Sequence, residues 1–239
     1  MRSSVPVLRS SQAGFSLIEI SIVLMVIGIV GGMSLHLLSA QIHRAAYLKT
    51  RENQEYALTA IAAFVERHHR FPCPADPKAI GIEYGLEAKE RKCTANKAEG
   101  ILPFRTLGIS EVFAKDGFKR WLTYVIDSAL ADKDNENYLH TVVGKQITLR
   151  NEHSQPVLID QSSRIPNFVA FLLISHGESG GGSFLGNGQS GRLFMPSPSP
   201  QKRENQDGNF IFIESPYTDD IIRWESRDHF LKHYVRFRE

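Results

Sequence analysis

The stretch FSLIEISIVLMVIGIVGGMSLHLL, residues 15–38, decides how this chain is organised, because its apolar residues are concentrated there. It contains one acid, Glu19, and one histidine, His36. At about 1.5 Å per residue, a helix of this length reaches across the roughly 30 Å hydrocarbon core of a bilayer. A secretory signal peptide fits less well, because its small-residue cleavage site follows a shorter apolar core, whereas Ala13-Gly14 precedes this one. The run therefore predicts a membrane-spanning helix.

Glu19 is the unusual residue of this run. A carboxylate in hydrocarbon costs several kcal/mol unless it finds a partner, so an acid at such a position indicates a function. If the chain is cut after Gly14, the new α-amino group of Phe15 lies about one helical turn from Glu19. That amine, on the same subunit or on a neighbour, is a suitable counter-charge. The alternative is that Glu19 reaches the headgroups, since it lies near the end of the run, and the spacing does not separate the two.

The segment 14–19, Gly-Phe-Ser-Leu-Ile-Glu, follows a short basic leader and opens the apolar run. This arrangement resembles the processing site of type IV pilins and type II secretion pseudopilins. The resemblance implies cleavage between Gly14 and Phe15 by a membrane prepilin peptidase, usually with N-methylation of the new terminus. It also implies that Glu19 guides assembly into a helical fibre. One departure is His36, where many members of the family carry a proline.

The rest of the chain predicts an α+β protein with one long helix packed on an antiparallel β-sheet, and the resemblance implies that this fold is type IV pilin-like. The helical pattern continues to about residue 70, where Pro72 and Pro74 end it. A loop rich in Gly, Ser and Pro is expected near 176–208, and a closing helix at 226–237. The expected strands are 121–126, 141–149, 156–159, 168–174 and 209–213.

These features divide the chain of 239 residues into three parts. Residues 1–14 are expected to form a leader peptide. Residues 15–70 are expected to form the long helix, with a membrane-spanning first half and an amphipathic second half. Residues 71–239 are expected to form a globular head in the periplasm. The chain has 28 basic and 26 acidic residues, so it has no overall basic field that would attract nucleic acid.

Two cysteines, Cys73 and Cys93, flank an irregular charged segment of the predicted head. A disulfide between them would close a loop of about twenty residues and stabilise the fold by ~3 kcal/mol. Such a bond persists in an oxidising compartment such as the bacterial periplasm. The alternative is that both are free thiols.

A second resemblance concerns the glycine-rich segment 175–182, SHGESGGG, and the segment 219–224, DDIIRW. In the major pseudopilins of type II secretion systems, a glycine-rich loop runs into an Asp-Ile-x-x-Trp segment and commonly holds calcium. This resemblance implies a structural calcium bound by oxygens of Asp219, Asp220 and Glu178. The long insertion between the two segments, and His176 where the family tends to have aspartate, depart from that pattern. The alternative is that Asp219 only stabilises a turn and that no cofactor is bound.

The segment 177–181, Gly-Glu-Ser-Gly-Gly, looks superficially like the nucleophile loop of trypsin-like proteases. Serine catalysis needs a histidine base and an orienting acid nearby, and no histidine of this chain has the sequence context of that family. The protein is therefore expected not to be an enzyme.

The expected function is that of a structural subunit, either of a type IV pilus or of a type II secretion pseudopilus, and either major or minor. Its partners would be prepilin peptidase, other pilin or pseudopilin subunits in a helical fibre, and an inner-membrane assembly platform. The subunit would wait in the inner membrane as a single-pass protein before it enters the fibre. The alternative is a membrane-anchored periplasmic binding protein or hydrolase that uses the helix only as an anchor.

Overall fold

The computed structural model describes residues 14, 16–88, 93–94, 97–132, 146–160, 165–166 and 169–235. Residues 1–44 and residues 45–239 form two separate contact units. Phe15 and the predicted leader, apart from Gly14, lie outside the described residues.

A single helix, α1 (Leu17–His68), contains 52 residues and confirms the long helix predicted for residues 15–70. It ends where His69 adopts a left-handed φ of 52°, shortly before two prolines that cannot continue a helix. Among the described residues, no helix combines the length and the apolar character needed to cross a membrane. The predicted membrane-spanning first half is therefore not confirmed and stays a prediction.

The head is built on a four-stranded antiparallel sheet, as predicted. Its strands are β1 (Glu99–Ile101), β2 (Thr123–Ile126), β6 (Val169–Ser175) and β10 (Ile221–Ser226), in the order β1-β2-β6-β10. Every residue of β6 is buried, which explains why this strand reads as a continuous apolar run in the sequence. Phe171 and Leu173 belong to one buried cluster, and Leu172 and Ile174 to another, so the sheet has a core on each face.

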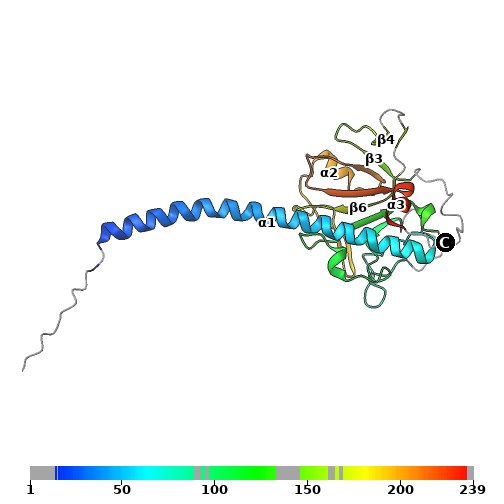
Figure 1. Ribbon diagram of the computed structural model, residues 1–239, viewed down its shortest axis with the longest axis horizontal. Helices are drawn as coiled ribbons and strands as arrows, with labels where there is room; N and C mark the ends of the chain where they lie inside the picture. Colours follow the sequence, from blue (N-terminus) through cyan, green and yellow to red (C-terminus); the bar gives the residue numbers. More distant parts are fainter. Residues whose placement is uncertain are drawn as a thin grey trace, which may run out of the picture. The chain divides into compact units, whose positions relative to one another are not determined.

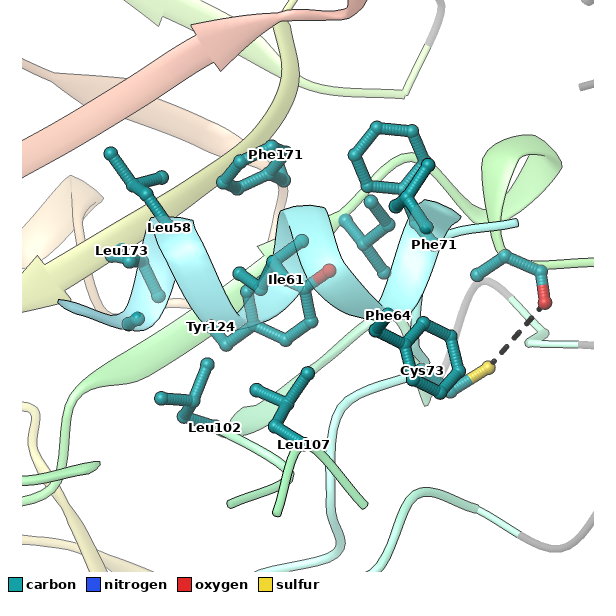
Figure 2. Close-up of a cluster of buried hydrophobic side chains, with 14 of the residues drawn as sticks. Leu58, Ile61, Phe64, Phe71, Cys73, Leu102, Leu107, Tyr124, Phe171 and Leu173 are labelled. Carbon is teal, nitrogen blue, oxygen red and sulfur yellow. Dashed lines mark hydrogen bonds between the residues drawn. The ribbon is translucent and has the colours of Figure 1, made fainter. Parts of the chain in front are cut away.

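One of these cores is formed against the C-terminal half of α1, which lies along the sheet (Figure 1). Leu58, Ile61 and Phe64 recur at helical spacing and are buried there. Figure 2 shows them packed with Tyr124 and with aromatic and aliphatic side chains of the head. The predicted packing of the helix on the sheet is therefore confirmed for this half of α1.

The second core is covered by a small parallel pair, β3 (Thr148–Arg150) and β9 (Ile211–Ile213). This parallel pair lies outside the predicted antiparallel sheet and was not predicted. Its strands are far apart in the sequence, so their pairing carries no local signal. The remaining small elements are β4 (Leu158–Asp160), which pairs with β5 (Ile165–Pro166), and the 3-10 turns η2 (Glu111–Ala114) and η3 (Ser128–Leu130). Of the strand predicted at 141–149, residues 141–145 lie outside the described residues.

The region 176–208, predicted as one long loop, contains regular structure. Strands β7 (Phe184–Gly186) and β8 (Gln189–Arg192) form a hairpin. Asn187 and Gly188 have φ values of 50° and 80° at its turn, which suits a tight hairpin connection. A short helix, α2 (Pro200–Glu204), begins with a proline at its first position and has Ser199 as its N-cap.

The C-terminal part of the head adds one strand that the sequence analysis missed. Residues 221–226 form β10 at the edge of the main sheet. The prediction for the segment 219–224 concerned only the ion ligands Asp219 and Asp220 that precede this strand. The closing helix predicted at 226–237 is present as α3 (Arg227–Tyr234), and its N-cap is Ser226.

Candidate functional site

The N-terminal part of α1 exposes apolar side chains on all sides. Large apolar residues between Leu17 and Ile29 are exposed, with Leu17 88% and Met25 67% accessible. A helix that is apolar all round is normally covered by lipid or by other protein. Among the described residues no such cover is present, so this segment is suited to a partner from outside the unit in which it lies.

The predicted processing and assembly residues lie at the start of this segment. Gly14 is exposed, and a side chain added there would meet no described atom within 4 Å. Phe15 lies outside the described residues. Glu19 is exposed in the first turn of α1, where its backbone N–H bonds to the carbonyl oxygen of Ser16 at 3.0 Å. No described group donates to its carboxylate, so any counter-charge for it must come from elsewhere.

The C-terminal half of α1 is fastened to the head by three buried polar side chains that the sequence analysis did not single out as a group. The hydroxyl of Thr50 accepts a hydrogen bond from the N–H of Gly117 at 2.9 Å. The amide of Asn53 donates to the carbonyl oxygens of Val112 and Lys115, at 3.1 and 2.7 Å. The spacing of these side chains, on the face that also carries the apolar residues, was the available signal.

Gln54 completes this set and connects the helix to two strands at once. Its amide donates to the carbonyl oxygens of Leu173 in β6 and Ile221 in β10, at 3.2 and 2.9 Å. Close approach also explains Gly117, since a Cβ there would lie only 1.9 Å from the carbonyl oxygen of Ala46. Only glycine allows the turn to contact the helix backbone in this way.

The segments expected to hold calcium do meet in the head. Ser175 is the last residue of β6, and residues 176–177 follow it. Asp219 and Asp220 precede the partner strand β10, so strand pairing brings the two segments together. The ammonium of Lys202 lies among their oxygens: it is 2.6 Å from Asp219 Oδ1, 2.5 Å from Asp220 Oδ1 and 3.0 Å from the carbonyl oxygen of His176. The sequence analysis missed Lys202, because no pattern marks it within a Ser/Pro-rich stretch.

With the Lys202 ammonium in place, this donor set does not fit a calcium ion. Calcium needs six to eight oxygen ligands, and here a lysine ammonium already contacts the two carboxylates. Glu178, the third expected ligand, is exposed and is not part of the buried cluster. In the described part of the chain, no group of three or more His, Cys, Asp or Glu side chains is placed to hold a metal ion.

The environment of Lys202 changes the pKa values of both aspartates and includes the buried ring of His176. Burial alone would raise the pKa of Asp219 and Asp220. At Asp219, the hydrogen bond and charge of Lys202 and the hydrogen bond from Ser179 outweigh burial and lower the pKa. At Asp220, the proximity of the His176 ring and the charge of Lys202 outweigh burial and lower the pKa. Nε2 of His176 lies 3.1 Å from the Thr123 hydroxyl, while Nδ1 is 3.7 Å from Asp220 and makes no hydrogen bond.

Ser179, the serine of the protease-like segment, is also part of this region. Its backbone N–H donates to Asp219 Oδ2 at 2.7 Å, and its hydroxyl lies 3.5 Å from the carbonyl oxygen of His176. These contacts give Ser179 a place in the turn. The expectation that the protein is not an enzyme stays a prediction.

Cys73 and Cys93 are both buried, and both are free thiols. The neighbouring Cys73 thiol, together with burial, raises the pKa of Cys93. Cys73 also contacts the carbonyl oxygen of Ala131 at 3.8 Å (Figure 2). The predicted disulfide is therefore not formed here, but its two sulfurs are neighbours, and its formation in an oxidising compartment stays a prediction.

Comparison with known proteins identifies the N-terminal segment. Residues 9–35 match the family described as the prokaryotic N-terminal methylation motif. No curated protein and no solved structure matches the chain. The match includes Gly14, Phe15 and Glu19. The chain therefore carries a prokaryotic N-terminal methylation motif, consistent with its resemblance to type IV pilins and pseudopilins.

Proposed function

We propose that this protein is a structural subunit of a helical fibre, a pilin or pseudopilin, made as a precursor and cut between Gly14 and Phe15 by prepilin peptidase. The observation that carries the proposal is the match of residues 9–35 to the N-terminal methylation motif. The fibre is either a type IV pilus or a type II secretion pseudopilus, and the subunit waits in the inner membrane, with its head in the periplasm, until assembly.

The exposed apolar side chains of the N-terminal half of α1 support this proposal. Burying apolar surface releases roughly 25 cal/mol per Å², so a helix with large exposed residues from Leu17 to Ile29 gains stability from any apolar cover. Lipid supplies that cover before assembly. The same helices of neighbouring subunits supply it in the fibre, where no further change of structure is required.

Glu19 would fix the axial offset between neighbouring helices, which apolar contacts alone leave undetermined. Its carboxylate has no partner among the described residues, and an unpaired charge in an apolar environment is costly. The α-amino group of Phe15, which cleavage creates, would neutralise it. If the amine belongs to a neighbouring subunit, only one axial offset between two helices brings the charges together.

The first test is mass spectrometry of the mature protein isolated from membranes of the producing cells. We expect a chain that begins at Phe15 and carries one methyl group on its α-amino nitrogen. Protein that keeps residues 1–14, or that is cut beyond residue 35, would contradict the proposal. Such a result would favour a binding protein or hydrolase that uses the helix only as an anchor.

The same measurement, made without reducing agent, tests the periplasmic location of the head. We propose that Cys73 and Cys93 form a disulfide there: two thiols lose two protons and two electrons to a disulfide oxidant, and one S–S bond forms. A proteolytic peptide that links the two cysteines is the expected result. Two fully reduced peptides from protein alkylated in intact cells would contradict it.

A further inference from the structure

The junction between residues 175–177 and residues 219–220 places two carboxylates next to each other, one of them buried and one partly exposed. Asp219 and Asp220 are adjacent in sequence, and the side chain of Asp220 is 0% exposed. Two neighbouring carboxylates repel one another, and the 0% exposure of the Asp220 side chain removes the water that would screen it, whereas the Asp219 side chain is 35% exposed. A fold that places them together therefore needs a cation at this point.

Lys202 supplies a positive charge from a distant part of the chain. Its side chain is 3% exposed, and lysine is almost never buried to this extent unless it is paired. An ammonium has three N–H donors. The three oxygens around this one belong to Asp219, Asp220 and the backbone of His176, so each donor has an acceptor.

The short helix α2 is held so that Lys202 reaches this position. The hydroxyl of Ser199 accepts from the backbone N–H of Lys202 at 3.2 Å. Asn205 exchanges two hydrogen bonds with the backbone of Ile213 in β9, at 2.6 and 3.0 Å. The same Asn205 side chain donates to Asp220 Oδ2 at 2.9 Å. The hydrogen bonds of Ser199 and Asn205 therefore fix α2, and with it the backbone of Lys202, in the position from which the side chain reaches the carboxylates.

The backbone of the glycine-rich turn packs directly against the backbone of Asp219. Gly177 has a φ of 63°, and a Cβ there would lie 2.0 Å from the carbonyl oxygen of Asp219. Arg120 donates to the carbonyl oxygen of Gly177 at 2.5 Å, next to the carbonyl oxygen of His176 that accepts from Lys202. Two cationic side chains therefore bind consecutive carbonyl groups of the turn.

We propose that Lys202 is a structural cation of the head. Its ammonium links the glycine-rich turn to the residues that precede β10, at a place where a bound divalent ion could otherwise do so. The carboxylates and the backbone carbonyl form the kind of oxygen cluster that a hard cation would take. In this chain the cation comes from α2, which lies between the glycine-rich turn and β10 in the sequence. The head should therefore fold without metal, and this inference does not depend on whether the protein forms a fibre.

The test is thermal unfolding of the full-length protein in detergent, followed by near-ultraviolet circular dichroism. The wild-type midpoint should not change when calcium chloride or EDTA is added. Lys202→Met keeps a buried aliphatic side chain and removes the charge, and we expect its midpoint to fall by about 10 °C, since a buried carboxylate loses its partner. Lys115→Met, which removes an ion pair on a partly exposed surface, is the control and should change the midpoint by less than about 2 °C.

Two further variants separate a cation site from ordinary packing. Asp220→Asn combined with Lys202→Met should recover at least about half of the loss, because it removes the uncompensated charge. Lys202→Ala leaves space between the carboxylates, so its midpoint should rise on addition of calcium chloride, but not of sodium chloride at equal ionic strength. Lys202→Met, which fills that space, should not respond.

Three results would overturn the proposal. The first is a wild-type midpoint that rises saturably with calcium. The second is a Lys202→Met variant as stable as the wild type, or one that Asp220→Asn does not improve. The third is a Lys202→Ala variant that does not respond to calcium, because the oxygens would then form no cation site.

Discussion

The two halves of α1 belong to one helix, yet they differ in which side chains are buried and in whether the polar ones have partners. Between Leu17 and Ile29 the large apolar side chains are exposed, and the single acid has no described partner. Between Thr50 and Val65 the large apolar side chains that face the sheet are buried, and three buried polar ones are hydrogen-bonded to the head. The second half therefore finds its partners within its own unit. The first half requires partners that its unit does not supply.

The largest expected effect is on assembly. Glu19→Ala removes the charge that we expect to pair with the amine of Phe15, so incorporation into fibres should fall at least about tenfold, in line with the cost of mispairing a charge in an apolar environment. Processing at Gly14 should continue. The measurement is the ratio of fibre-associated to membrane-associated subunit in sheared cells.

The control for this prediction is Glu52→Ala, which removes an exposed acid from the C-terminal half of the same helix. It should leave assembly unchanged. Normal incorporation of Glu19→Ala would show that the two halves do not differ in the way described, since the acid would then have no role in association.

The next effect concerns the stability of the head. Phe64 is 1% exposed and belongs to the core between α1 and the sheet (Figure 2). Phe64→Ala should lower the free energy of unfolding by about 3–5 kcal/mol through lost contacts and the cavity left behind. Met25→Ala, in the exposed half, should leave it within about 0.5 kcal/mol. Chemical denaturation in detergent measures both, and equal losses would remove the distinction between the two halves.

The smallest expected effect is that of removing one buried polar side chain, Gln54. Gln54→Ala removes two hydrogen bonds to strand carbonyl groups, and each is worth about 1 kcal/mol in net stability. We expect a loss of about 2 kcal/mol. Gln41→Ala, at an exposed position of the same helix, is the matched control and should cost less than about 0.5 kcal/mol. A Gln54 variant as stable as its control would mean that apolar packing alone holds the helix.

The sequence predicted the features that depend on local pattern. The helix was predictable because its periodicity is long and two prolines stop it, and β6 because a strand buried on both faces is continuously apolar. The motif around Gly14 and Glu19 is likewise local. These are the parts in which neighbouring residues alone carry the signal.

The features that depend on long-range contacts were not predictable in the same way. The parallel pairing of β3 with β9 joins segments about sixty residues apart. Lys202 lies 17 and 18 residues from the two aspartates it contacts, within a stretch predicted as a loop. The family resemblance drew attention to Asp219 and Asp220 as ion ligands, and residues 221–226, which follow them, were not predicted to form the edge strand that they do form.

The polar contacts of α1 also bear on how the head carries mechanical load. Five hydrogen bonds join α1 to the head through the side chains of Thr50, Asn53 and Gln54. Their partners in the head lie in three separate segments: residues 112–117, β6 and β10. Sliding the helix along the sheet by one turn, about 5.4 Å, would break all five together, whereas apolar contacts alone could re-form at the new offset. Tension along the helix would therefore meet resistance to slippage at these three side chains.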